Sequence, residues 1–204
     1  MKSPDSNPAS NLRVWDPLVR LFHWSLVAGV ALAWMTSELA EHGDDGTGVH
    51  LWVGYVVAAI VAARVLWGFV GPRHARFTSF VRSPAVVAGH ARQMWRGDEP
   101  RYIGHNPLGG WMIVALLAFT IAASVSGWLY TTDAYWGVEW VEALHGALGD
   151  ALVPLFALHV AGVILASIRH RESLVGAMIH GRKPSVRPGD VASGDAHDRV
   201  MRRE

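Results

Sequence analysis

Four long apolar stretches alternate with polar segments along the chain. They run over residues 18–36, 50–70, 108–130 and 145–168. A helix needs about 20 mostly apolar residues to cross the hydrocarbon core of a bilayer. The apolar positions are continuous rather than alternating with period two, so they predict membrane helices and not barrel strands. We therefore expect an all-α fold, a four-helix transmembrane bundle.

The charges between these stretches predict their orientation. The segments after the first and third stretches contain Asp and Glu but no Lys or Arg. Basic residues instead flank the start of the first stretch, fill the 71–107 segment and follow the fourth stretch. Loops rich in Lys and Arg remain in the cytoplasm. The pattern places the N and C termini and the 71–107 loop in the cytoplasm of a multi-pass protein of a bacterial inner membrane.

Polar segments bound the expected membrane domain, which covers residues 13–183. Residues 1–12 and 184–204 are rich in Pro, Ser, Gly and Asp, and we expect them to be polar tails. The cytoplasmic loop contains SPAVVAGHARQMWR, starting at Ser83. This segment predicts a short amphipathic helix that begins at Ser83-Pro84 and lies on the membrane surface.

The amino-acid composition excludes several classes of protein and of functional site. Hydrophobic residues make up 51% of the chain and charged residues only 17%, against about 25% in ordinary soluble domains. A net charge of +1 gives no field that would attract nucleic acid. The absence of cysteine excludes disulfides, thiolate-held iron–sulfur clusters, covalent c-type haem and a cysteine nucleophile. The 11 histidines direct attention to imidazole chemistry.

Four histidines lie within or at the ends of the apolar stretches, where a polar side chain is costly and suggests a function. In the expected orientation, His23 is near the cytoplasmic side and His50 near the periplasmic side. Residues 145 and 159 are 14 positions apart, which is about 21 Å along one face of a helix. The histidines therefore form two pairs by depth, one cytoplasmic and one periplasmic: His23 with His159, and His50 with His145.

Two imidazoles on facing helices can hold the iron of a haem between them. The four histidines are thus the candidate metal ligands, and two haems would lie about 20 Å apart. A lone membrane histidine more often makes an interhelical hydrogen bond, but pairing by depth favours ligation. Zinc is disfavoured because its tetrahedral ligands must converge at one depth. No residue stands out as catalytic.

Two further residues are candidates for cofactor binding. Arg64 lies near the expected depth of His159, where it either pairs with a haem propionate or extends to the cytoplasmic headgroups. His105 precedes the third stretch, where it is either a propionate contact, a proton donor to quinone or an ordinary loop residue. Asn106 is expected to cap the following helix. The remaining histidines are expected in water-exposed loops or tails: His42, His74, His90, His170, His180 and His197.

Several segments resemble the bacterial cytochrome b561 family, including the b-type cytochrome subunits of nickel–iron hydrogenases. They are RVWDPLVRLFHW at 13–24, HLWVGYVVAAIVAARVLWGFVGPRHARFTSF at 50–80, RYIGHNPLGG at 101–110 and the segment 142–183 with its LHVAG and HRESLVGAMIHGRK motifs. The resemblance implies four membrane helices with two b-type haems, and electron transfer between the quinone pool and a redox partner. The axial ligands of the family fall on His23, His50, His145 and His159.

The expected function is therefore that of a dihaem membrane cytochrome b, with quinone as substrate and membrane lipid around it. A c-type cytochrome or a hydrogenase-like subunit is the expected redox partner. The acidic outward loops either dock a basic protein of this kind or are ordinary solvated loops. One alternative is a small cytochrome b561 that oxidises superoxide and reduces quinone, although acidic outward loops would repel that anion. Another, from a different class, is a haem-free membrane anchor or transporter whose histidines are structural or relay protons.

Overall fold

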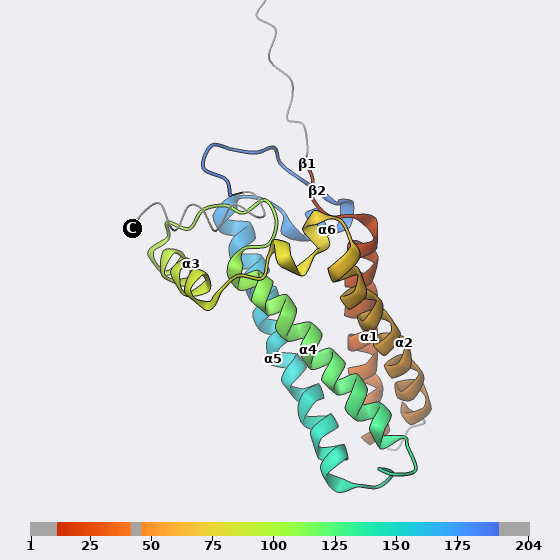
Figure 1. Cartoon of the computed structure of the whole chain (residues 1–204). Coiled ribbons are helices and arrows are strands. Elements are labelled where there is room, and N and C mark those ends of the chain that lie inside the picture. Colours follow the sequence, from red (N-terminus) through yellow and green to blue (C-terminus); the bar gives the residue numbers. More distant parts are fainter. Residues whose placement is uncertain (1–11, 42–45, 192–204) are drawn as a thin grey trace, which may run out of the picture.

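A computed structural model of the chain describes residues 12–41 and 46–191. It contains four long helices, and each is long and apolar enough to cross a membrane. They are α1 (Pro17–Glu41), α2 (Gly46–Val70), α4 (Pro107–Tyr130) and α5 (Glu139–His170). The four predicted spans and the all-α fold class are confirmed, and each helix contains the corresponding apolar stretch (Figure 1).

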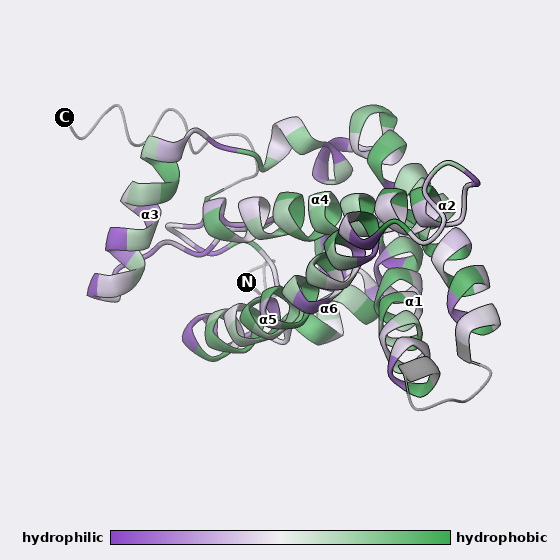
Figure 2. Ribbon diagram, turned by 90° about the horizontal axis from the view of Figure 1, so that it is seen from below, coloured by the Kyte–Doolittle hydropathy of each residue, from purple (hydrophilic) through white to green (hydrophobic). Residues whose placement is uncertain are grey.

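The long helices form two pairs, α1 with α2 and α4 with α5, and the close backbone packing of α2 against α4 joins the pairs. At Gly29 of α1, an added Cβ would lie 2.7 Å from a methyl group of Val57, so the glycine permits this approach of α2. Apolar residues surround the helices rather than following one face (Figure 2). Such exposure is expected for helices that lie in lipid.

Shorter elements gather at one end of the bundle, where Figure 1 shows α6 beside the two short strands and α3 on the other side of this end. The arginine distribution assigns this end to the cytoplasm. We refer to these elements together as the cytoplasmic cap. They are β1 (Leu12–Arg13), η1 (Arg73–Ala75), η2 (Phe77–Ser79), α3 (Pro84–Arg96), α6 (Leu174–His180) and β2 (Arg182–Lys183), with β1 antiparallel to β2.

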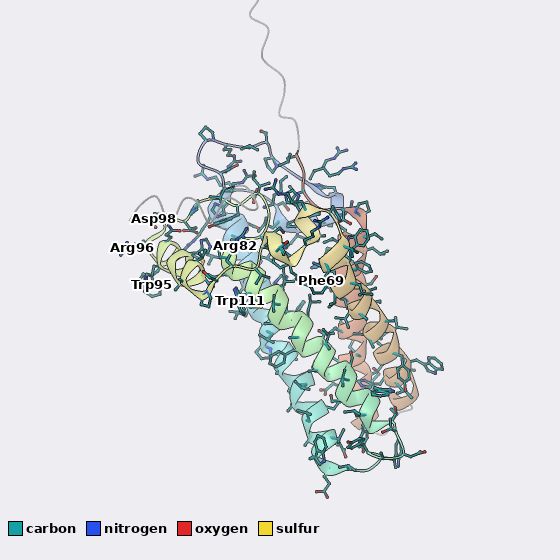
Figure 3. All side chains as sticks on the ribbon, viewed as in Figure 1. Phe69, Arg82, Trp95, Arg96, Asp98 and Trp111 are labelled. Carbon is teal, nitrogen blue, oxygen red and sulfur yellow. The ribbon has the colours of Figure 1, made fainter. Side chains whose placement is uncertain are left out.

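The amphipathic helix predicted in the cytoplasmic loop is confirmed as α3. It begins after Ser83 with Pro84 in its first turn, where proline is favoured because its nitrogen needs no hydrogen-bond acceptor. Trp95 is 92% exposed and lies at the outer end of the helix (Figure 3). At the other end of α3, the indole of Trp111 donates a hydrogen bond to the carbonyl oxygen of Arg82, 2.8 Å away. This bond attaches the start of α3 to the first turns of α4.

A buried ion-pair cluster holds the cap together. Arg101 donates to Glu172 at 2.8 Å and to Asp190 at 2.5 Å, while the Lys183 ammonium group lies 3.0 Å from Glu172. The backbone of Tyr102 also bridges that of Val191. Residues 184–191 fall within the predicted C-terminal tail, yet they pack against the cap through these contacts. The predicted tail residues 1–11 and 192–204 lie outside the described residues.

The expectation that all the remaining histidines are water-exposed is wrong for His90. This side chain is only 3% exposed, on the inner face of α3, and its ring meets that of Tyr102 edge-on at 5.2 Å between centroids. Burial lowers the pKa of His90, and it also lowers the pKa of the half-buried His74. Nothing in the sequence pattern indicated this burial, because it depends on how the segment after α3 folds back so that Tyr102 meets His90. His42 and His197 lie outside the described residues.

Candidate functional site

The imidazoles of His50 and His145 face each other near the periplasmic end of the bundle. Their ring centroids are 5.8 Å apart and their planes are at 85°. His50 lies in the second turn of α2 and His145 in the second turn of α5. The structure therefore brings together the two histidines that their depth had paired.

Each of these rings is oriented by a backbone carbonyl of a neighbouring helix. Nδ1 of His50 lies 2.8 Å from the carbonyl oxygen of Ala33, and Nδ1 of His145 lies 3.0 Å from that of Ala123. A carbonyl oxygen can only accept, so in both rings Nδ1 carries the proton and Nε2 keeps a lone pair. Ligating histidines are typically held in this manner by their second nitrogen.

The geometry of this pair fits a shared iron centre. Two imidazoles on opposite sides of one metal place their ring centroids about 6 Å apart, because each metal–nitrogen bond is about 2 Å and the ring centre lies roughly 1 Å beyond the nitrogen. The observed 5.8 Å agrees with this value. Close packing of α5 against α2 is not found among the described helices, so the two side chains reach toward each other from separated backbones.

A glycine missed in the sequence allows His145 to take its position. A Cβ at Gly127 on α4 would lie 2.8 Å from Cε1 of His145, so only hydrogen fits at that position. By contrast, a Cβ at Gly54 or Gly146, which are close to the candidate ligands in sequence, would meet nothing within 4 Å. The signal in the sequence was the adjacent pair Ser126-Gly127 within an apolar helix, but its role depends on which helix lies opposite.

The other pair, His23 on α1 and His159 on α5, lies toward the cytoplasmic end. The two rings are within range of electrostatic interaction with each other. Nδ1 of His23 is buried and has no hydrogen-bond partner among the described residues. The ring of His23 also meets that of Trp24 edge-on, with 5.0 Å between centroids. The cytoplasmic level therefore contains two imidazoles. Unlike His50 and His145, His23 has no backbone carbonyl bonded to its Nδ1 among the described residues.

Arg64 is buried on the cytoplasmic half of α2 and does not extend to the surface. It is 6% exposed, and its guanidinium carbon lies 5.6 Å from the ring centroid of Phe77. One terminal nitrogen is 3.5 Å from the carbonyl oxygen of Ala75, and the other, Nη1, has no partner within the described residues. A buried guanidinium with an unused donor fits a carboxylate partner, which a haem propionate would provide.

His105 lies between two aromatic side chains at the start of α4. Its ring centroid is 4.5 Å from that of Trp15 and 4.9 Å from that of Phe80. Burial lowers the pKa of His105 to about 3, and the positive charges of Lys183 and Arg64 act in the same direction. His105 is thus a neutral imidazole at neutral pH. The next residue, Asn106, caps α4 as predicted, with its side-chain oxygen accepting from the nitrogen of Gly109 at 2.6 Å.

The candidate ligands are distributed as two pairs rather than one cluster. Within residues 12–41 and 46–191, no group of three or more His, Asp or Glu side chains is placed to hold a metal ion. Four imidazoles at two levels suit two haem irons, each with two protein ligands, and do not suit a tetrahedral zinc site.

The chain was compared with known families and proteins. The family model described as prokaryotic cytochrome b561 matches residues 14–181. A protein of Azotobacter vinelandii named "Probable Ni/Fe-hydrogenase B-type cytochrome subunit" is 28% identical over 211 residues, which cover 82% of this chain and 86% of that protein. A protein of the same name from Bradyrhizobium diazoefficiens is 25% identical over 218 residues, covering 83% of this chain and 85% of that protein. No solved structure matches the chain.

Proposed function

Because the chain belongs to the prokaryotic cytochrome b561 family, we propose that it carries two b-type haems and transfers electrons between the quinone pool and a redox partner. As a member, it is a multi-pass b-type cytochrome of a bacterial inner membrane that takes part in electron transfer. The family assignment thus favours the cytochrome over a haem-free anchor or transporter. Haem b supplies one-electron chemistry at its iron when bound.

The observation that carries the proposal is the opposed pair His50 and His145. Their 5.8 Å separation and their hydrogen-bonded Nδ1 atoms leave two Nε2 lone pairs available to one iron. These two histidines would hold the iron of a haem at the periplasmic level. His23 and His159 would hold the cytoplasmic haem in the same way, and their common depth on α1 and α5 supports this pairing.

Two further residues serve the cytoplasmic haem and the quinone in this proposal. The unused donor of Arg64 would bind a haem propionate, and its positive charge would favour the reduced state of a haem bound at this level. His105 is a neutral imidazole within electrostatic range of both Arg64 and His159. It therefore offers one donor and one acceptor for a propionate or a quinone oxygen at the cytoplasmic end.

The periplasmic end suits a protein partner with a basic surface. Exposed acidic side chains lie there, among them Glu38, Asp133 and Glu139. The relatives are named as subunits of nickel–iron hydrogenase, so we propose a hydrogenase-like subunit as the partner, with a c-type cytochrome as the second candidate. The same acidic side chains disfavour superoxide as a substrate, because they repel an anion.

Reduced-minus-oxidised spectra and haem stoichiometry test the proposal. The purified wild type should contain two b-type haems per chain. The His159→Ala variant should retain the periplasmic haem, and the His50→Ala variant should retain the cytoplasmic haem. Replacement of His170, the last residue of α5, which is not placed as a ligand, is the matched control and should leave two. A wild-type chain with one haem, or loss of the periplasmic haem alone in His159→Ala, would contradict the assignment.

A further inference from the structure

A cavity of about 420 Å³ opens at the cytoplasmic end of α1. Four of its six lining residues carry basic side chains, and the other two are Trp15 and Pro17. The basic ones are Arg13, Arg20, His180 and Arg182. They come from β1, from the first turn of α1, and from the end of α6 with β2, so tertiary structure gathers them from both ends of the domain. Neither the haem ligands nor Arg64 line this cavity.

Two of the arginines are directly opposed across the short sheet. Arg13 of β1 pairs in register with Arg182 of β2, and both side chains are exposed. Like charges at directly opposite positions of an antiparallel pair repel each other. In the described part of the chain, no carboxylate forms an ion pair with Arg13, Arg20 or Arg182. An anion placed between them would remove this repulsion.

Arg20 contributes a buried donor on the wall of the cavity. Its terminal nitrogen donates to the carbonyl oxygen of Ile179, while its Nε is buried without a hydrogen-bond partner among the described residues. The nearby carboxylate of Asp16 is already used, since it accepts from the backbone nitrogens of Leu18 and Val19. Asp16 therefore does not pair with these arginines, and the buried Nε of Arg20 remains available to a bound oxygen.

Exposed apolar side chains adjoin two of the residues that line the cavity. Leu21, one residue after Arg20, is 60% exposed, and Ile179, one residue before His180, is 57% exposed. Trp24 donates to the carbonyl oxygen of Met178 at 3.4 Å, which attaches α6 to the side of α1. A basic cavity whose lining residues adjoin exposed apolar side chains suits a molecule that has both an anionic headgroup and an acyl chain.

We propose that this cavity binds the phosphodiester of an anionic phospholipid from the cytoplasmic leaflet. Arg13 and Arg182 bind phosphate oxygens from the two strands, and Arg20 binds from the helix. The acyl chains then extend into the bilayer along Leu21 and Ile179. Inorganic phosphate shares the charge of the headgroup but lacks the chains, so comparison of the two ligands separates a lipid site from a general anion site.

Native mass spectrometry of the haem-loaded, full-length protein tests this proposal. The protein is released from a mild neutral detergent after incubation with phosphatidylglycerol, phosphatidylcholine or ammonium phosphate. The wild type should retain one phosphatidylglycerol, with little phosphatidylcholine and no phosphate. The double variant Arg13→Gln/Arg182→Gln should reduce phosphatidylglycerol retention at least fivefold. Arg92→Gln, at an exposed arginine of α3 outside the cavity, should retain it as the wild type does.

Three outcomes would overturn the proposal. Equal phosphatidylglycerol retention in the double variant would show that lipid binds elsewhere. Retention of phosphate with an affinity equal to that of phosphatidylglycerol would make the cavity a general anion site. Loss of haem from the double variant would assign the arginines to the haem propionates instead. The charge-conserving variant Arg13→Lys/Arg182→Lys should restore lipid retention at least in part, which distinguishes a lost site from a misfolded cap.

Discussion

Thr36 on α1 and Ser126 on α4 stand in the same relation to two different histidines. Each hydroxyl lies 3.0 Å from the carbonyl oxygen three residues earlier in its own helix, and that of Thr36 also donates to the carbonyl oxygen of Leu32 at 2.8 Å. The carbonyl three residues earlier accepts the proton of a histidine Nδ1 from another helix, and the hydroxyl lies 3.5 Å from Nδ1 of His50 or 3.3 Å from that of His145. The rings of His50 and His145 are thus oriented in the same way, each by a backbone carbonyl with a neighbouring hydroxyl.

Replacement of these hydroxyls should have a small effect on haem retention. In Thr36→Val or Ser126→Ala the carbonyl remains as the acceptor of the Nδ1 proton, so we expect haem affinity to fall by less than about tenfold. Titration of the apoprotein with haem measures this. Thr120→Val is the control, because its hydroxyl bonds only to Leu116 of its own helix among the described residues. Complete loss of the periplasmic haem in either variant would show that the hydroxyl, and not the carbonyl, orients the ring.

Gly127→Ala should have a larger effect. The new methyl group would lie 2.8 Å from Cε1 of His145, so the ring must shift away from its carbonyl. We expect the affinity for the periplasmic haem to fall by about 10–100-fold, as for other disrupted contacts behind a metal ligand. Gly146→Ala, with no atom within 4 Å of the added Cβ, should bind haem as the wild type does. Similar affinities for the two variants would contradict the proposed position of His145.

Arg64→Gln should lower the reduction potential of the cytoplasmic haem. Arg64 is buried beside Phe77, so its positive charge is poorly screened and favours the reduced iron. A change on the order of 50 mV is expected, which is about tenfold in a one-electron equilibrium. Redox titration followed at the b-type haem band checks this, with Arg82→Gln in the loop as the control. An unchanged potential would show that Arg64 only supports packing.

The ion-pair cluster of the cap should be sensitive to removal of Glu172. Glu172→Gln leaves Arg101 and Lys183 buried with less compensation, and breaking such a buried pair costs about 3–5 kcal/mol. Glu99→Gln removes the ion pair between Glu99 and Arg169. Because Arg169 is partly exposed to solvent, this loss should cost about 1 kcal/mol or less. Thermal denaturation of the two variants measures the difference. Equal shifts in melting temperature would contradict a stabilising role for the cluster.

The same cluster predicts a loss of stability in acid. Burial would raise the pKa of Glu172, but the charge of Lys183 and the hydrogen bonds from Arg101 and Lys183 outweigh it and hold that pKa below 4.5. A depressed carboxylate pKa contributes stability above its unfolded value, and this contribution disappears as the pH falls through the folded value. The melting temperature of Glu172→Gln should therefore change less than that of the wild type below about pH 4.5. Parallel curves would exclude Glu172 as the group responsible.

The amino-acid sequence by itself determined the helices, their orientation and the levels of the candidate ligands. Depth along a membrane helix increases by a fixed rise for each residue. The positions of His50 and His145 within their spans were therefore sufficient to place them at one level. The distribution of arginine was likewise a linear property of the chain, and it assigned the cap to the cytoplasm.

Only the tertiary structure decided which groups surround these histidines. All backbone carbonyls are alike in sequence, so nothing distinguished Ala33 and Ala123 until neighbouring helices brought them to the two rings. The fit of Gly127 and the burial of His90 likewise depend on how other segments fold against them. The opposition of Arg13 and Arg182 arises from the pairing of the first and last strands. Such contacts result from the combined packing of many side chains, which the local pattern of a sequence does not encode.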